Sequence, residues 1–134
     1  MSYNYFITET HITFQTLSEA EKEIGTIRIP KLSSDYRITR VTYDNDGFTH
    51  PVTKVFYRNQ AQEVVFMIAS GWFEEYPAEV IEHQDIKDIK WIANDEEYIL
   101  RWRSSNKESY KFLITSKEED KEWFIGLAEE YERL

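Results

Sequence analysis

Two strand-like segments followed by an amphipathic helix occupy the last third of the chain, and this order constrains the fold more than any other feature. Residues 98–103 and 109–115 are rich in aromatic and β-branched side chains, and a polar turn at 104–107 separates them. From residue 116 to residue 134 the apolar side chains recur at helical spacing instead. Because such a helix must bury its apolar stripe, the order predicts a helix packed on one face of an antiparallel sheet.

The predicted C-terminal helix has a capping signal and an apolar stripe. Ser116 and Glu119 have the spacing of a capping box, so we expect the helix to begin there. We expect Trp91 and Trp102, which lie in predicted strands, to contact the helix and hold it on the sheet. The residues of the stripe are Trp123, Phe124, Leu127, Ala128, Tyr131 and Leu134.

Further strands are predicted through the middle of the chain. Polar and glycine-containing turns separate segments that are enriched in β-branched and aromatic residues, which is typical of an antiparallel meander. Alternation along the strand that contains Trp102 predicts that Arg101 and Arg103 lie on the opposite, solvent side. The predicted strands before residue 98 are 36–43, 52–57, 64–69, 80–81 and 86–92, and the last of these overlaps a strand predicted at 89–93.

A short helix is predicted near the N-terminus, over residues 17–24. Thr16 and Glu19 form a capping box at its start, and Gly25 can adopt the left-handed conformation that ends a helix. At 134 residues, with 41% apolar and 16% aromatic residues, the chain can bury one sizeable core. We therefore predict a single α+β domain over residues 1–134, with residues 1–15 as an N-terminal arm or strand and 16–134 as the core. Its sheet is mostly antiparallel and is packed by the C-terminal amphipathic helix and the short N-terminal helix.

Charge and cysteine content limit the classes of partner and chemistry. The net charge is −9, from 25 acidic and 16 basic residues, which argues against nucleic acid or an anionic membrane as the main partner. A basic protein, or a membrane-associated one, is a more natural partner, although acidity also serves simply to keep a domain in solution. The absence of Cys excludes disulfides, thiolate metal sites and cysteine catalysis.

The cellular compartment is predicted from the targeting signals in the printed sequence. It has no signal peptide at its start and no apolar run long enough to span a bilayer, so membrane insertion is not expected. We expect a cytoplasmic location on this basis, and an extracytoplasmic one if the chain is a domain of a longer exported protein.

No catalytic constellation is recognisable in the sequence. His11, His50 and His83 are far apart along the chain, without the spacing of a zinc motif. Only four Gly are present, and no phosphate-binding loop, dinucleotide motif or nucleophile elbow occurs. We therefore expect no enzyme activity, no cofactor and no metal.

An aromatic cluster is the candidate for a partner-binding surface. Trp72, Phe73 and Tyr76 lie in a stretch that contains Gly71 and Pro77, where no periodicity demands core aromatics. Packing within the core is the alternative role for the same side chains.

Several short motifs follow one another in a distinctive order: the 17–24 helix, Ile27-Arg28-Ile29-Pro30, Tyr36-Arg37-Ile38, Val55-Phe56-Tyr57, Leu100-Arg101-Trp102, Tyr110 and Ala128-Glu129. This order resembles an uncharacterised domain family of Gram-positive bacteria. Members of that family commonly follow a transmembrane segment, at the outer end of membrane-anchored or anti-sigma-factor-like proteins. The resemblance implies an extracytoplasmic sensing or binding role and supplies no catalytic residues, although this chain lacks the preceding membrane segment.

Three functions remain open from the sequence. The first is a non-enzymatic regulatory or binding domain, and the second is an acidic inhibitor or immunity-type protein that masks a basic partner. The third is a hydrolase whose site is built from scattered His and Glu, which requires two of the three histidines to meet a carboxylate. Exposed sheet edges also allow a homodimer.

Overall fold

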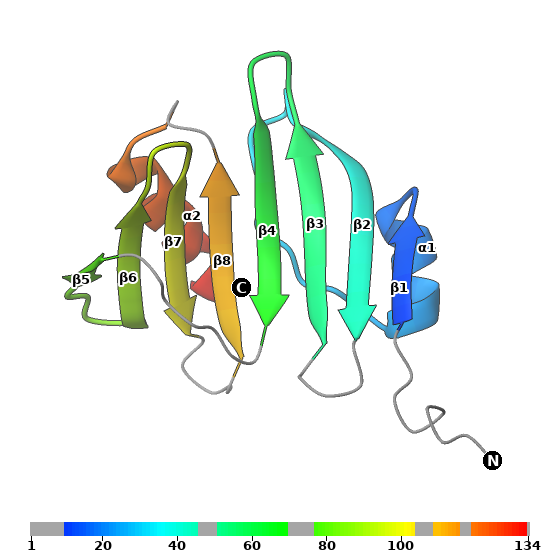
Figure 1. Cartoon of the computed structure of the whole chain (residues 1–134), viewed down its shortest axis with the longest axis horizontal. Coiled ribbons are helices and arrows are strands. Elements are labelled where there is room, and N and C mark those ends of the chain that lie inside the picture. Colours follow the sequence, from blue (N-terminus) through cyan, green and yellow to red (C-terminus); the bar gives the residue numbers. More distant parts are fainter. Residues whose placement is uncertain (1–9, 46–50, 70–76, 104–108, 116–118, 134) are drawn as a thin grey trace.

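The computed structural model describes residues 10–45, 51–69, 77–103, 109–115 and 119–133. In it, eight strands form one antiparallel sheet and two helices pack on it, which confirms the predicted α+β class (Figure 1). The strands are β1 (Thr10–Phe14), β2 (Arg37–Asn45), β3 (Val52–Arg58), β4 (Glu63–Ala69), β5 (Ala78–Ile81), β6 (Lys87–Ala93), β7 (Tyr98–Arg103) and β8 (Tyr110–Thr115). The helices are α1 (Leu17–Ile24) and α2 (Lys121–Arg133).

The sheet consists of two meanders that are joined at one seam. Its strand order is β1-β2-β3-β4-β8-β7-β6-β5, so each half contains four strands that are consecutive in sequence. The seam is the antiparallel pairing of β4 with β8, in which Phe66 lies opposite Leu113. All other neighbouring strands are joined within their own half. β1 and β5 are therefore the two edges of the sheet.

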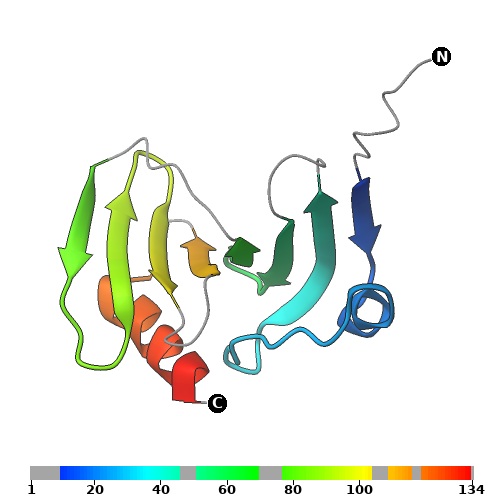
Figure 2. The ribbon, with the colours of Figure 1, turned by 90° about the horizontal axis from the view of Figure 1, so that it is seen from below.

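Both helices lie on the same side of the sheet. Figure 2 shows α1 beside β1 and β2 at one edge, and α2 under the half formed by β6, β7 and β8. Side chains alternate between the two faces of a strand, so every residue in the strands can be assigned to the helix side or to the opposite side. We call the opposite side the outer face.

The helix ends follow their sequence signals only in part. Thr16 caps α1 as predicted, since its hydroxyl accepts from the amide of Glu19 at 3.1 Å, and Gly25 follows with a φ of 93°. The second helix begins at Lys121 rather than at Ser116, which lies outside the described residues. Asp120 caps it, because its carboxylate accepts from the amide of Trp123 at 3.0 Å.

Aromatic side chains dominate the core between the sheet and α2. Trp102, on β7, is fully buried, and its ring lies 6.0 Å from that of Tyr131 and 6.4 Å from that of Phe66. Trp91, on β6, meets Phe124 edge-on at 4.9 Å. The predicted role of both tryptophans in seating α2 is thus confirmed. On α2, the buried residues are Phe124, Ala128 and Tyr131, while Trp123 and Leu127 are half-buried.

The segment between α1 and β2 ties the two halves together on the helix side. The Tyr57 hydroxyl donates to the carbonyl of Pro30 at 2.8 Å, in a buried position. The Arg28 guanidinium donates to the carbonyl of Tyr131 and lies over its ring at 4.5 Å. The Tyr131 hydroxyl donates in return to the carbonyl of Arg28 at 3.2 Å. The N-terminal half therefore contacts the last turns of α2.

One prediction about the outer face is wrong. Arg101 lies on the face opposite Trp102, as expected, but its exposed fraction is only 6%. It pairs with Phe112 across the strands and stacks over the ring of Tyr110 at 4.6 Å. The reason is a second apolar cluster on this face, which surrounds the arginine stem. Its buried members are Met67, Ala69, Ile92, Ile99 and Phe112.

The indole of Trp102 donates to a carboxylate oxygen of Glu132 at 2.8 Å, which allows a specific test. We expect Trp102→Phe to lower the free energy of unfolding by about 2 kcal/mol, because it removes this bond and leaves a void. Glu132→Gln keeps an oxygen that can accept, so its cost should stay below about 1 kcal/mol. Urea unfolding followed by circular dichroism measures both, and equal costs would contradict this assignment.

Burial of Tyr131 predicts a loss of stability at high pH. Burial, opposed by Arg28 and aided by Glu132, raises the pKa of its phenol from 10 to about 12. The unfolded chain therefore loses this proton first, so stability is complete below pH 10 and declines as the pH rises from 10 to 12. Burial also raises the pKa of Tyr57, which acts in the same direction. Chemical denaturation at a series of alkaline pH values should show the decline, and a flat profile would contradict it.

Candidate functional site

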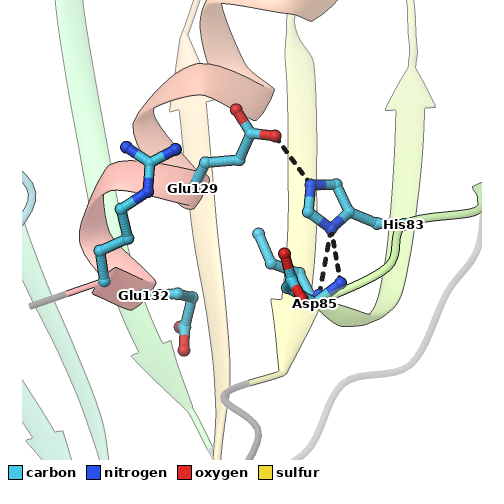
Figure 3. A pocket seen from close by; sticks show the side chains of 6 residues that line it. His83, Asp85, Glu129 and Glu132 are labelled. Carbon is cyan, nitrogen blue, oxygen red and sulfur yellow. Dashed lines mark hydrogen bonds and ion pairs between the residues drawn. The ribbon is translucent and has the colours of Figure 1, made fainter.

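A pocket lies between α2 and the segment that connects β5 to β6 (Figure 3). Three of its side chains come from the last turns of α2, where Glu129, Glu132 and Arg133 share one side because they are three or four residues apart. The other three, His83, Asp85 and Ile86, come from the connecting segment. The helix and the connection thus each supply half of the lining.

His83 is held by three hydrogen bonds, and Figure 3 shows them as dashed lines. Its Nε2 lies 2.8 Å from a carboxylate oxygen of Glu129. Its Nδ1 accepts from the backbone amides of Asp85 at 3.0 Å and Ile86 at 3.1 Å. Because amides can only donate, these contacts assign the neutral tautomer with its proton on Nε2, directed at Glu129.

This arrangement limits the chemistry that His83 can perform. A general base needs a ring nitrogen that can accept a proton from a substrate, and the Nδ1 lone pair is already occupied by two amides. The side chain of His83 is 16% exposed and that of Glu129 is 38% exposed, so water reaches the pair mainly from the carboxylate side. In this geometry the imidazole bridges the connecting segment to α2.

The second carboxylate of the pocket is engaged as well. Glu132 accepts the indole proton of Trp102 and so faces the core as well as the pocket. Arg133, at the rim, is exposed. The two glutamates of the pocket thus accept hydrogen bonds from His83 and Trp102. These bonds connect α2 to the β5–β6 segment and to β7.

The three histidines are not brought together in the described residues. His11 lies on β1, one edge of the sheet, where it pairs with Asp44 on β2. His83 follows β5, the other edge, and pairs with Glu129. His50 lies outside the described residues. Each of the two described histidines thus meets a carboxylate of its own, and they are separated by the width of the sheet.

The predicted aromatic surface lies outside the structural description. Trp72, Phe73 and Tyr76 fall in residues 70–76, between β4 and β5, which the structure does not describe. Within the described ranges, no group of three or more His, Asp or Glu side chains is arranged to hold a metal ion. Neither described helix is long and apolar enough to cross a membrane.

Sequence reasoning missed the separation of charge between the sheet and the rest of the chain. Nine of the 16 Lys and Arg residues lie in the described strands, whereas only four of the 25 Asp and Glu residues do. The pairing registers place eight of these nine basic residues on the outer face, and the ninth, Lys111, faces the helices. The alternation of cations with core residues along each strand was the available signal. The eight residues are Arg37, Arg40, Lys54, Arg58, Lys87, Lys90, Arg101 and Arg103.

Comparisons with known proteins do not add to this description. The chain matches no family model, no curated protein and no solved structure. Any functional assignment therefore rests on the geometry and charge of the chain itself.

The bridging role of His83 predicts an effect on stability. We expect His83→Ala to lower the free energy of unfolding by about 1–2 kcal/mol, because it leaves two backbone amides and one carboxylate without their partner. Gln84→Ala is the matched control, since Gln84 is the exposed neighbour on the same connection. Urea unfolding of both variants provides the measurement, and an equal effect of the two substitutions would remove the bridging role.

Proposed function

We propose that this chain is a non-enzymatic binding or regulatory domain whose two layers carry opposite charge and recognise partners electrostatically. The observation that carries the proposal is the cationic outer face in a chain of net charge −9. Complementary potentials of this kind guide association and select partners more than they add affinity.

The hydrogen bonds of His83 also support a non-catalytic function. Both of its ring nitrogens are occupied, so hydrolysis through this residue would require one of the contacts to break. His11 and Asp44 lie at the distant edge of the sheet and cannot join the same site. Hydrolysis therefore gains no support from the two described histidines.

An acidic inhibitor that masks a basic protein is the second candidate function. It is favoured by the helical layer, where exposed carboxylates lie on both helices and the one described strand cation on that side, Lys111, is buried. The exposed acidic residues of this layer are Glu19, Glu23, Glu122 and Glu130. The two candidates differ in the layer that makes the contact, so they can be distinguished by substitution.

Affinity capture with layer-specific variants tests the proposal. Wild-type domain, a helix-layer variant (Glu122→Gln with Glu130→Gln) and an outer-face variant (Arg37→Gln with Arg58→Gln) are immobilised and exposed to lysate and culture medium of the source organism. We expect a protein near equimolar amounts, identified by mass spectrometry, that is released by salt and lost with one variant only. Loss of a basic protein with the helix-layer variant would select the inhibitor function.

The same retained proteins on all three resins would contradict electrostatic recognition by either layer. An unrelated acidic domain of similar size serves as the control for proteins that bind any anionic surface.

A further inference from the structure

The outer face of β2 and β3 carries a cluster of cations that outnumbers the carboxylates beside it among the described residues. Arg37, on β2, lies directly opposite Arg58, on β3, and the side chains of such partners start about 5 Å apart. Both residues are exposed. Like charges in directly opposed positions destabilise a sheet, so this pair costs stability rather than adding it.

The neighbouring charges leave this end of the face positive. Arg40 lies further along β2 and stacks over the ring of Phe56 at 3.7 Å. Glu63, on β4, is the register partner of Arg58, but its carboxylate pairs with Arg40, at 3.7 Å. Of the described strand residues at this end of the sheet, Glu63 alone places a carboxylate beside the three guanidinium groups, and it pairs with Arg40.

Asp35 precedes this end of β2 and lines a pocket with Arg37, but it forms no ion pair with Arg37 or Arg58. Its carboxylate accepts from the hydroxyl of Ser33 and from the side-chain amide of Asn59, the latter at 3.0 Å. These bonds lower its pKa, so it is ionised at neutral pH while directed to other donors. Among the described residues, neither Arg37 nor Arg58 forms an ion pair.

The chemistry of this cluster fits carboxylates presented along an extended segment. A guanidinium binds a carboxylate through two parallel hydrogen bonds, and adjacent guanidiniums relieve their repulsion by sharing such a partner. The ring of Phe56 restricts the orientation of Arg40, which lowers the entropy lost when an anion binds. Lys54, two residues before Phe56 on the same face, extends the positive strip along β3.

A protein segment fits better than a nucleic acid. Charges interact over about 8 Å at physiological salt, so a short acidic segment responds mainly to this cluster. A long polyanion would extend past it onto β4 and β8, where Met67 and Phe112 offer no charge, or off the sheet toward the acidic residues outside the strands. Complementarity is therefore local and suits a ligand of a few residues.

We propose that the outer face of β2 and β3 is a docking site for an acidic, extended segment of a partner protein, whose carboxylates bind Arg37 and Arg58. This inference rests on the proposed binding function and names the chemistry of its partner. For this face it favours an acidic partner, whereas the net charge of the chain favours a basic one, since the acidic residues lie mainly outside the strands.

Fluorescence anisotropy with a labelled hexaglutamate peptide tests the site. We expect saturable binding to the wild-type domain that weakens between about 20 mM and about 150 mM salt. Arg37→Gln with Arg58→Gln should weaken binding about tenfold or more, because hydrogen bonds to charged groups are lost. The control variant, Lys22→Gln with Lys31→Gln, changes the net charge equally at exposed positions outside the strands and should stay within about twofold.

Thermal unfolding separates loss of the site from loss of the fold. We expect the melting temperature of the Arg37→Gln, Arg58→Gln variant to rise by about 1–3 °C, because the opposed like charges are removed. Weaker peptide binding by a more stable protein would identify the arginines as binding residues.

Three results would overturn the proposal. They are the absence of saturable binding to the wild-type domain, equal weakening by the control variant, and tighter binding of a decathymidylate that also depends on Arg37 and Arg58. If the peptide fails to bind while affinity capture still retains a partner through the helical layer, the docking site is rejected and the binding function stands. If the peptide binds through the arginines while no partner is captured, the site is supported independently.

Discussion

The burial of Trp102 beneath α2 is the contact on which most of the other packing depends. Its ring meets Tyr131 and Phe66, which belong to α2 and to β4, and its indole proton is held by Glu132. Tyr131 in turn joins Arg28 in the segment that follows α1. One buried side chain on β7 therefore connects the C-terminal helix, the seam of the sheet and the N-terminal half. A large aromatic ring suits this place, since it contributes buried area together with one polar group that needs a single acceptor.

This packing also explains where the cations lie. The helix side of the sheet must be apolar and aromatic, because two helices and the 26–36 segment cover it. Basic residues of the strands are therefore directed to the outer face, where long side chains can lay their aliphatic stems over apolar neighbours and keep their charge near water. Arg101 is the exception, since it is only 6% exposed and its guanidinium lies over the ring of Tyr110. The separation of charge is thus a consequence of covering only one face of the sheet with helices.

Local patterns were sufficient to predict most of the elements. The strand predicted at 98–103 and the helix predicted at 17–24 have the bounds found in the structure, because turns and caps mark both clearly. The start of α2 was placed too early, since Ser116 and Glu119 mimic a cap that Asp120 provides. The pairing of β4 with β8 could not be predicted, because it joins residues far apart in sequence and leaves no local signal.

The candidate site was less accessible to sequence reasoning than the fold. His83 and Glu129 are 46 residues apart, and only the packing of α2 brings them together. The opposition of Arg37 and Arg58 depends on the register of β2 and β3, including an irregularity between Ile38 and Arg40. A shift of one residue would place either arginine on the helix side. Alternation could reveal that cations favour one face, but register decides which of them are neighbours.

The seam between β4 and β8 has a consequence for synthesis of the chain. When Ala69 has emerged from the ribosome, the first four strands can pair in sequence, but the partner of β4 begins only at Tyr110. Until then β4 is an edge strand, and its sequence, Glu-Val-Val-Phe-Met-Ile-Ala, is almost entirely apolar. Unpaired apolar edges recruit other strands and promote aggregation. The nascent chain is therefore most vulnerable to aggregation during the synthesis of residues 70–115, and any truncation within that range would make this edge permanent.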